Sequence, residues 1–242
     1  MSGRRLRRSV NNVILSGRYT VFGEKLREYG YHVIFSETVP MLIPYEQQHA
    51  DMQCLIVDNT AFVLKECPNL VEQLKQFYHV IVCKENVGGE YPQNVPLNAA
   101  VVGKYLIANL RSLSSDVKEY CLNHGYQLVH VNQGYAKCSC AIISEDALIT
   151  ADEGIYRSLI ELKIDVLKIR QGRVNLKGAD YGFIGGASGQ DKQGQKRILW
   201  FSGDIKKHPD HVAIAAFCRK HGTEIRSLTD GELTDIGGMM FC

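Results

Sequence analysis

The side chains best suited to chemistry lie in two short segments of the chain. Residues 237–242 join a pair of glycines to an apolar run that ends in a thiol, Cys242. Asp58 and Asn59 directly follow the apolar run 55–57. A thiolate is a nucleophile and a carboxylate pairs with cationic groups, so Cys242 is a candidate nucleophile and Asp58 a candidate ligand for a cation. The alternative is that Cys242 is only an exposed terminal thiol and that the Asp58 carboxylate only caps a turn.

A glycine-rich stretch, residues 182–189, is the most unusual part of the sequence. Glycine lets backbone N–H groups approach an anion, so Gly185, Gly186 and Ser188 are predicted to line a site for a carboxylate or phosphate. The stretch lacks the Lys-Ser/Thr ending of a phosphate-binding P-loop and the spacing of a dinucleotide fingerprint. A flexible hairpin explains it equally well. Asp180, just before it, either pairs with a cationic group or starts a turn.

Eight cysteines are spread along the chain, and most lie inside apolar runs. Such spacing is typical of buried free thiols in a reducing compartment, which favours a cytoplasmic protein without disulfides. The His208 and His211 pair and the Cys138 and Cys140 pair do not indicate a metal site, because no second pair of closely spaced ligands completes either. The sequence therefore predicts neither a metal ion nor another cofactor.

The composition is that of an ordinary globular protein. The chain has 242 residues, of which 45% are hydrophobic, with 28 basic and 26 acidic residues. A net charge of +2 is too small for a dedicated nucleic-acid binder, and no apolar run approaches the roughly 20 residues that span a bilayer. Four arginines at positions 4, 5, 7 and 8 indicate a solvated basic tail rather than a signal peptide, because no long apolar stretch follows them.

The chain contains a repeated pattern. Three helix-like segments end in a glycine that is followed by a strand-like run, at Gly30, Gly125 and Gly222. Glycine is favoured there because the residue after a helix often takes a left-handed conformation. Residues 76–82 and 162–167 show the same switch from helix to strand without the glycine, and they fill the two gaps. With the apolar segments upstream, each repeat is predicted to form strand, turn, strand, helix and strand.

The first and last segments complete each other. The first repeat lacks a leading strand, and residues 237–242 form a leading strand without a helix. In a ring of repeats closed by strands from both ends of the chain, the last segment would supply the leading strand that the first repeat lacks. We therefore expect one domain over residues 1–242, with an ordinary two-domain α/β sandwich as the alternative. The predicted repeats cover approximately residues 10–45 with 233–242, then 50–90, 95–132, 135–175 and 180–230.

Three segments resemble a known group of proteins. Residues 55–63, 103–108 and 231–242 are similar to motifs of the pentein fold, which the guanidino-group-modifying enzymes share. These enzymes include dimethylarginine dimethylaminohydrolase, the arginine and agmatine deiminases, and the amidinotransferases. The resemblance implies an α/β propeller of five ββαβ units with pseudo-five-fold symmetry, closed by the C-terminal strand, with a ligand at its central axis.

The resemblance also implies roles for individual residues. Cys242 takes the position of the nucleophile that attacks a guanidinium carbon. Asp58 takes that of a carboxylate that binds the guanidinium group, and Asn59 beside it stands where a second carboxylate is usual. Asn98 stands where a further carboxylate is usual. The histidine that moves protons is expected near residues 134–137, but none is present there and the nearest is His130.

Two functions from different classes follow. The first is a cysteine-dependent hydrolase or transferase that acts on a small guanidino or amine-bearing molecule, similar to the deiminases and amidinohydrolases that cleave C–N bonds. The second is a catalytically degenerate pentein that binds a small molecule or a macromolecular partner, which the missing histidine and carboxylate favour. The partner expected at the ring axis is a small ligand, and neither nucleic acid nor a membrane is expected to bind. Nothing in the sequence indicates how many copies of the chain associate.

Overall fold

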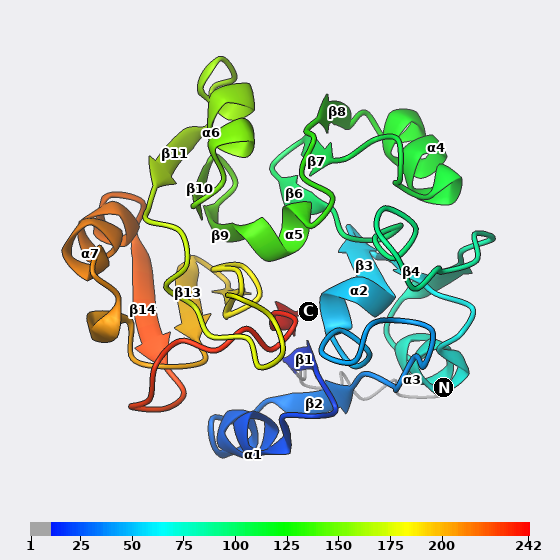
Figure 1. Ribbon diagram of the computed structural model, residues 1–242, viewed down its shortest axis with the longest axis horizontal. Helices are drawn as coiled ribbons and strands as arrows, with labels where there is room; N and C mark the ends of the chain where they lie inside the picture. Colours follow the sequence, from blue (N-terminus) through cyan, green and yellow to red (C-terminus); the bar gives the residue numbers. More distant parts are fainter. Residues whose placement is uncertain (1–10) are drawn as a thin grey trace, which may run out of the picture.

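Five three-stranded sheets stand around a central axis, with the main helix of each unit towards the outside of the ring (Figure 1). The computed structural model describes residues 11–242, so the predicted basic tail at positions 4–8 lies outside the described residues. The arrangement confirms the predicted propeller of five strand–strand–helix–strand units.

Every sheet has the same strand order. The first strand of a unit runs antiparallel to the second, and the second pairs in parallel with the third. The first strands lie nearest the axis and are β15 (Met240–Phe241), β3 (Cys54–Val57), β6 (Ala100–Val102), β9 (Cys140–Ser144) and β12 (Ser188–Gln193). The second strands are β1 (Asn12–Leu15), β4 (Thr60–Val63), β7 (Tyr105–Ala108), β10 (Ala147–Thr150) and β13 (Lys196–Phe201). The third strands are β2 (His32–Phe35), β5 (His79–Val82), β8 (Gln127–His130), β11 (Asp165–Lys168) and β14 (Thr223–Ser227).

A helix joins the second and third strands of each unit, as the right-handed crossover between parallel strands requires. These helices are α1 (Thr20–Glu28), α3 (Pro68–Leu74), α4 (Ser115–Asn123), α6 (Glu153–Ile160) and α7 (His211–Lys220). Three short helices lie outside this scheme: α2 (Ala50–Gln53), α5 (Ala136–Ser139) and the 3-10 helix η1 (Ile205–Lys207).

Glycine follows three of the crossover helices, as predicted. Gly30, Gly125 and Gly222 have φ angles of +88°, +75° and +64°, in the left-handed region where other residues are disfavoured. At the opposite end of a helix, the Asp152 carboxylate accepts a hydrogen bond from the Ile155 N–H group and so caps α6. Local sequence signals therefore account for these helix boundaries.

The ring is closed by the two ends of the described chain. β15 pairs with β1 through Val13 opposite Phe241 and Ile14 opposite Met240. Beyond this ladder the Asn12 N–H group donates to the Cys242 carbonyl oxygen at 2.8 Å. The C-terminal strand thus supplies the first strand that the N-terminal unit lacks, as the sequence predicted.

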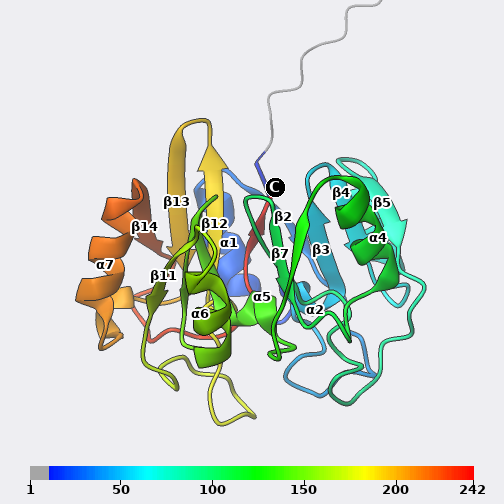
Figure 2. The same ribbon diagram turned by 90° about the horizontal axis from the view of Figure 1, so that it is seen from above.

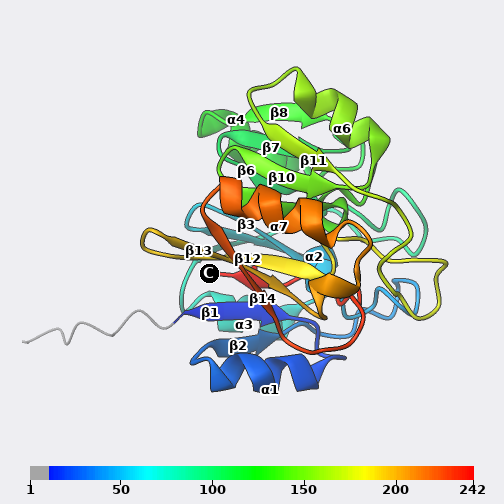
Figure 3. The same ribbon diagram turned by 90° about the vertical axis from the view of Figure 1, so that its left-hand side faces the viewer.

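The two ends of the ring axis differ. Figure 2 shows the C-terminus towards one end and the short helices α2 and α5 towards the other, where the first strands begin, and Figure 3 shows the same separation of the C-terminus and α2. Apolar side chains fill the units around the axis, and Phe62, Trp200 and Phe201 are among the largest that are fully buried. All eight cysteines are free, and all but Cys242 are buried. No helix within residues 11–242 has the length and apolar character of a membrane span.

Candidate functional site

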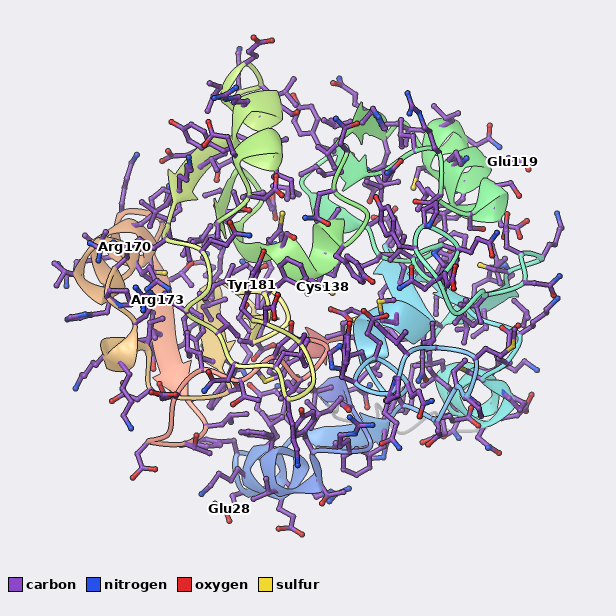
Figure 4. All side chains as sticks on the ribbon, viewed as in Figure 1. Glu28, Glu119, Cys138, Arg170, Arg173 and Tyr181 are labelled. Carbon is purple, nitrogen blue, oxygen red and sulfur yellow. The ribbon has the colours of Figure 1, made fainter. Side chains whose placement is uncertain are left out.

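Five buried polar side chains gather at the end of the ring where the first strands begin. This axial cluster consists of His49, Asp51, Asn98, Cys138 and Asp235, each no more than 3% exposed. They come from the segments directly before β3, β6, β9 and β15, so the repeated architecture brings them together. In Figure 4, Cys138 lies near the centre of the ring, whereas Arg170 and Glu28 lie at its periphery.

Asn98 holds two of these segments in place. Its Nδ2 atom donates to Cys138 Sγ at 3.0 Å and to the Asp51 carbonyl oxygen at 3.2 Å. Its Oδ1 atom accepts from the N–H groups of Lys137 and Cys138 at the start of α5. Because both ends of the amide are engaged within the protein, Asn98 positions the cluster rather than presenting a free ligand group.

The central contact joins a thiol and a carboxylate. Cys138 Sγ donates to Asp51 Oδ2 at 3.0 Å. Burial, reinforced by the negative charges of Asp51 and Asp235, raises the pKa of Cys138 well above its ordinary value. The thiol is therefore protonated at neutral pH, and a thiolate would require a positive charge close by.

A histidine and a second carboxylate flank this contact. His49 Nδ1 lies 3.9 Å from Asp235 Oδ1. Asp235 accepts from the N–H groups of Phe183 and Gly237, and burial raises its pKa. Within residues 11–242, His49 Nε2 and Asp51 Oδ1 are buried without a hydrogen-bond partner. Buried polar atoms are almost always paired, so these two atoms are available to a ligand.

An outer pocket of about 380 Å³ lies next to the cluster, and we call it the mouth pocket. Four aromatic rings and two carboxylates dominate its lining: Tyr45, Tyr135, Tyr181, Phe183, Glu46 and Asp180. The rings of Tyr135 and Phe183 stack with their centroids 5.8 Å apart. Aromatic faces and carboxylates both attract cations, so the mouth pocket suits a positively charged molecule.

Glu46 connects the mouth pocket to the axial cluster. Its side chain is 5% exposed, and its Oε2 atom accepts from Asn94 Nδ2 at 2.9 Å. Burial raises the pKa of Glu46, while the nearby charges of His49 and Asp51 act in opposite directions on it. Glu46, Asp51 and Asp235 together place three carboxylates at this end of the axis.

The glycine-rich stretch differs from the predicted anion-binding loop. The N–H groups of two predicted ligand residues are already used, since Gly186 donates to the Cys138 carbonyl oxygen at 3.0 Å and Ser188 donates to that of Gly185. Glycine is required instead for close packing, because a Cβ atom on Gly186 would lie 2.1 Å from Asp235 Oδ1. Gly185 and Gly186 thus form a wall of the cluster, and Ser188 begins β12.

Three predicted site residues lie away from the cluster. Asp58 and Asn59 are exposed in the turn between β3 and β4, where the Tyr126 hydroxyl donates to Asp58 Oδ1 at 2.8 Å. Cys242 follows β15 at the other end of the axis (Figures 2 and 3), four extended residues or roughly 13 Å beyond Gly238. The structure therefore brings Asn98, Gly185 and Gly186 to the cluster and Asp180 to the mouth pocket, but not these three.

Sequence reasoning missed most of the cluster. His130, the nearest histidine to the predicted position, is exposed and accepts from the Leu110 N–H group. The histidine of the axial cluster is His49, which precedes the first strand of a different unit. Cys138 was considered only as part of a metal pair with Cys140, whereas it lies on α5, ahead of β9, which begins at Cys140. The signal that could have found these residues is their position, because polar residues of the cluster precede four of the five first strands.

One group of potential metal ligands lies elsewhere among the described residues. Atoms of Cys83, Glu85 and Asp116 come within 4.8 Å of one another. Hydrogen bonds from the start of α4 occupy Glu85, and an ion pair with Lys84 occupies Asp116. Helix capping and ion pairing account for both carboxylates, so the group does not support a metal centre.

Five ββαβ units around an axis, with a polar cluster where the first strands begin, define a pentein-type propeller. Solved structures with this fold align over nearly the whole chain. A dimethylarginine dimethylaminohydrolase mutant from Pseudomonas aeruginosa complexed with citrulline has a TM-score of 0.57 at 11% identity, covering 96% of this chain and 99% of that one. Agmatine deiminase from C. jejuni has a TM-score of 0.51 at 9% identity, covering 93% and 91%. An amidinotransferase from Microseira wollei has a TM-score of 0.50 at 10% identity, covering 94% and 89%.

By sequence, the chain belongs to a family of unknown function, DUF6873, whose pattern matches residues 14–240. No curated protein sequence matches it. These structures confirm the resemblance to the pentein fold, and at these identities they establish the fold alone.

Proposed function

We propose that the protein is a cysteine-dependent hydrolase or transferase that acts on a small guanidino or amine-bearing molecule, with Cys138 as the nucleophile. The observation that carries this proposal is the 3.0 Å contact between Cys138 Sγ and Asp51 Oδ2, next to a pocket of aromatic rings and carboxylates. The thiol comes from the start of the fourth unit, and not from Cys242 as the sequence suggested.

The charges at the site support a cationic substrate. Glu46, Asp51 and Asp235 are all buried, and a bound cation would offset the cost of burying their negative charges together. A guanidinium group offers five N–H donors in one plane, which pair with carboxylates two at a time. Asp51 Oδ1, which has no partner within residues 11–242, is one such acceptor.

The proposed reaction proceeds in two stages. As Cys138 Sγ bonds to the guanidinium carbon, the thiol proton passes to Asp51, and the positive charge of the substrate favours the thiolate. A C–N bond then breaks, the leaving amine takes the proton from Asp51, and a thiouronium group stays on the enzyme. Water adds to this carbon and the C–S bond breaks, which releases a ureido product and two protons, one to the thiol and one to the amine. We assign the binding of this water to His49 Nε2. If an amine attacks instead of water, the amidino group is transferred to that amine.

The experiment uses 2-chloroacetamidine, a cationic electrophile shaped like the substrate, and iodoacetamide as its neutral counterpart. Peptide mass spectrometry is expected to find the amidine adduct on Cys138, formed at least tenfold faster than the iodoacetamide adduct. Asp51→Asn and Glu46→Gln should each slow the amidine reaction at least tenfold. Cys242→Ala is the matched control and should leave the rate unchanged.

The proposal also requires turnover. Release of ammonia or amine from a panel of small guanidino molecules should be detectable with the native protein and absent with Cys138→Ser. An adduct on Cys242, or slow labelling spread over several cysteines at similar rates for both reagents, would contradict Cys138 as the nucleophile.

One observation favours a second candidate, a pentein that binds a cation without reacting. Cys138 is only 2% exposed, and burial raises its pKa well above the ordinary value. Isothermal titration calorimetry with the same guanidino molecules separates the two functions. Saturable binding that depends on Glu46, together with no adduct and no product, would identify a binding protein.

A further inference from the structure

A second cavity, of about 280 Å³, runs along the ring axis between the first strands, and we call it the axial cavity. All five units line it, and its lining does not include any residue of the mouth pocket. Its volume is close to the lower end of the range for small-molecule sites. It therefore has room for a compact ligand distinct from the substrate proposed above.

The wall of the axial cavity is mostly apolar. Each first strand contributes a half-buried side chain to it: Ile56, Val101, Ile142, Gln190 and Phe241. Four of these five are hydrocarbon groups that remain partly exposed, although the neighbouring residues of β3, β6 and β9 are buried. Covering this surface with an apolar ligand would be favourable, at roughly 25 cal/mol for each Å² removed from water.

A single cationic side chain, Lys137, also lines the cavity. A Cβ atom on Gly238 would lie 3.1 Å from Lys137 Nζ and 3.5 Å from Asp51 Oδ2, which places the ammonium group at the end of the cavity next to the axial cluster, where β15 begins. Its polar contact is the Gly185 carbonyl oxygen at 3.4 Å, the outer limit of a hydrogen bond. None of the ion pairs within residues 11–242 includes Lys137.

We propose that the axial cavity binds a small monocarboxylate with an apolar tail. The carboxylate pairs with Lys137 Nζ, and the tail lies among the half-buried side chains of the first strands. A half-buried ammonium group without an ion pair favours an anion over a neutral or cationic ligand, and the apolar wall excludes a small hydrated ion such as phosphate. The site goes beyond the proposed function and does not depend on it.

The test is isothermal titration calorimetry of the full chain with hexanoate, compared with hexylamine and 1-hexanol as probes of the same length. Hexanoate is expected to bind at one site per chain, at least tenfold more tightly than either comparison. Lys137→Met should weaken hexanoate binding at least tenfold, and Ile142→Phe, which fills the cavity, should abolish it. Lys163→Met, at an exposed lysine, is the matched control and should bind normally.

A charge-retaining variant separates loss of the ligand from loss of the fold. Lys137→Arg should keep hexanoate binding within a few-fold, and Cys138→Ser should leave it unchanged whether or not the protein proves to be an enzyme. Equal binding of hexylamine and hexanoate would overturn the proposal, as would the absence of saturable binding in the native protein. Undiminished affinity in both Lys137→Met and Ile142→Phe would place the ligand elsewhere and overturn it as well.

Discussion

Close contacts between single atoms limit which residues can surround the axial cluster. Asp235 is enclosed by Gly182 and Gly186, where added Cβ atoms would come within 2.4 Å and 2.1 Å of its side chain. Such contacts are far below van der Waals distance, so the carboxylate fits only while both positions remain glycine. A sequence alone shows the glycines but not the carboxylate, which lies about 50 residues further along. This is why the stretch resembled an anion-binding loop.

At this scale we predict that Gly186→Ala destabilises the protein by about 1–3 kcal/mol, the usual cost of overpacking. Thermal unfolding should show a melting temperature lower by several degrees. Gly231→Ala is the control, because a Cβ atom there would meet nothing closer than 3.5 Å. Equal melting temperatures for the two variants would mean that Asp235 moves aside without cost.

Individual elements were predictable where local signals define them. The crossover helices and the glycines after them follow from periodicity and capping, and the structure confirms Gly30, Gly125 and Gly222 in left-handed conformations. The four-residue helix α5 was missed, because so short a helix is unstable by itself. Instead, the N–H groups of Lys137 and Cys138 in this helix donate to Asn98 Oδ1, about 40 residues earlier in the chain. The site residues on α5 were missed for the same reason.

One element depends on a carboxylate from the preceding unit. Glu85 accepts from the Ser114 hydroxyl and from the Ser115 N–H and hydroxyl groups at the start of α4, each at 2.7 Å. Burial acts to raise its pKa, but these hydrogen bonds outweigh it and lower the pKa to about 2. Its contribution to stability is therefore present above the unfolded pKa of about 4.3 and is lost as the pH falls towards 2.

Glu85→Gln is expected to lower the free energy of unfolding at pH 7 by about 1 kcal/mol, allowing for solvent screening of a partly exposed group. The difference from the native protein should shrink between pH 4.5 and pH 2. Urea unfolding at several pH values measures it, with Glu90→Gln at an exposed position as the control. A difference that grows on acidification would reverse the assigned direction of the pKa shift.

The ring as a whole was the most predictable level. Helix-to-strand switches recurring along the chain, and a leading strand missing at one end but present at the other, were enough to infer five units and their closure. The end of the axis at which the site lies was not predictable, because the first strands have polar residues at both of their ends. Asp58 and Asn59 lie at the turn end, and Asp51 lies only seven positions earlier at the opposite end.

Ring closure depends on few residues. Phe241 pairs with Val13 and packs against the rings of Tyr31 and Trp200, with centroids 5.1 Å and 6.4 Å away. We expect Phe241→Ala to reduce the free energy of unfolding by about 2 kcal/mol, less than for a fully buried ring. Urea unfolding measures the loss, and Val212→Ala, at a position 70% exposed, should change it little. Similar values for both variants would show that the closing strand adds little to the stability of the ring.

The hydrogen bond between Asn12 and Cys242 has a consequence for protein engineering. Because the two ends of the described chain meet within one sheet, a short peptide can join them without disturbing any strand. New termini can then be opened in an exposed connection between units, such as the one around Gly172. A circularly permuted chain would begin at a different unit and still build the same ring, so the order in which the units are synthesised could be varied while their contacts are kept.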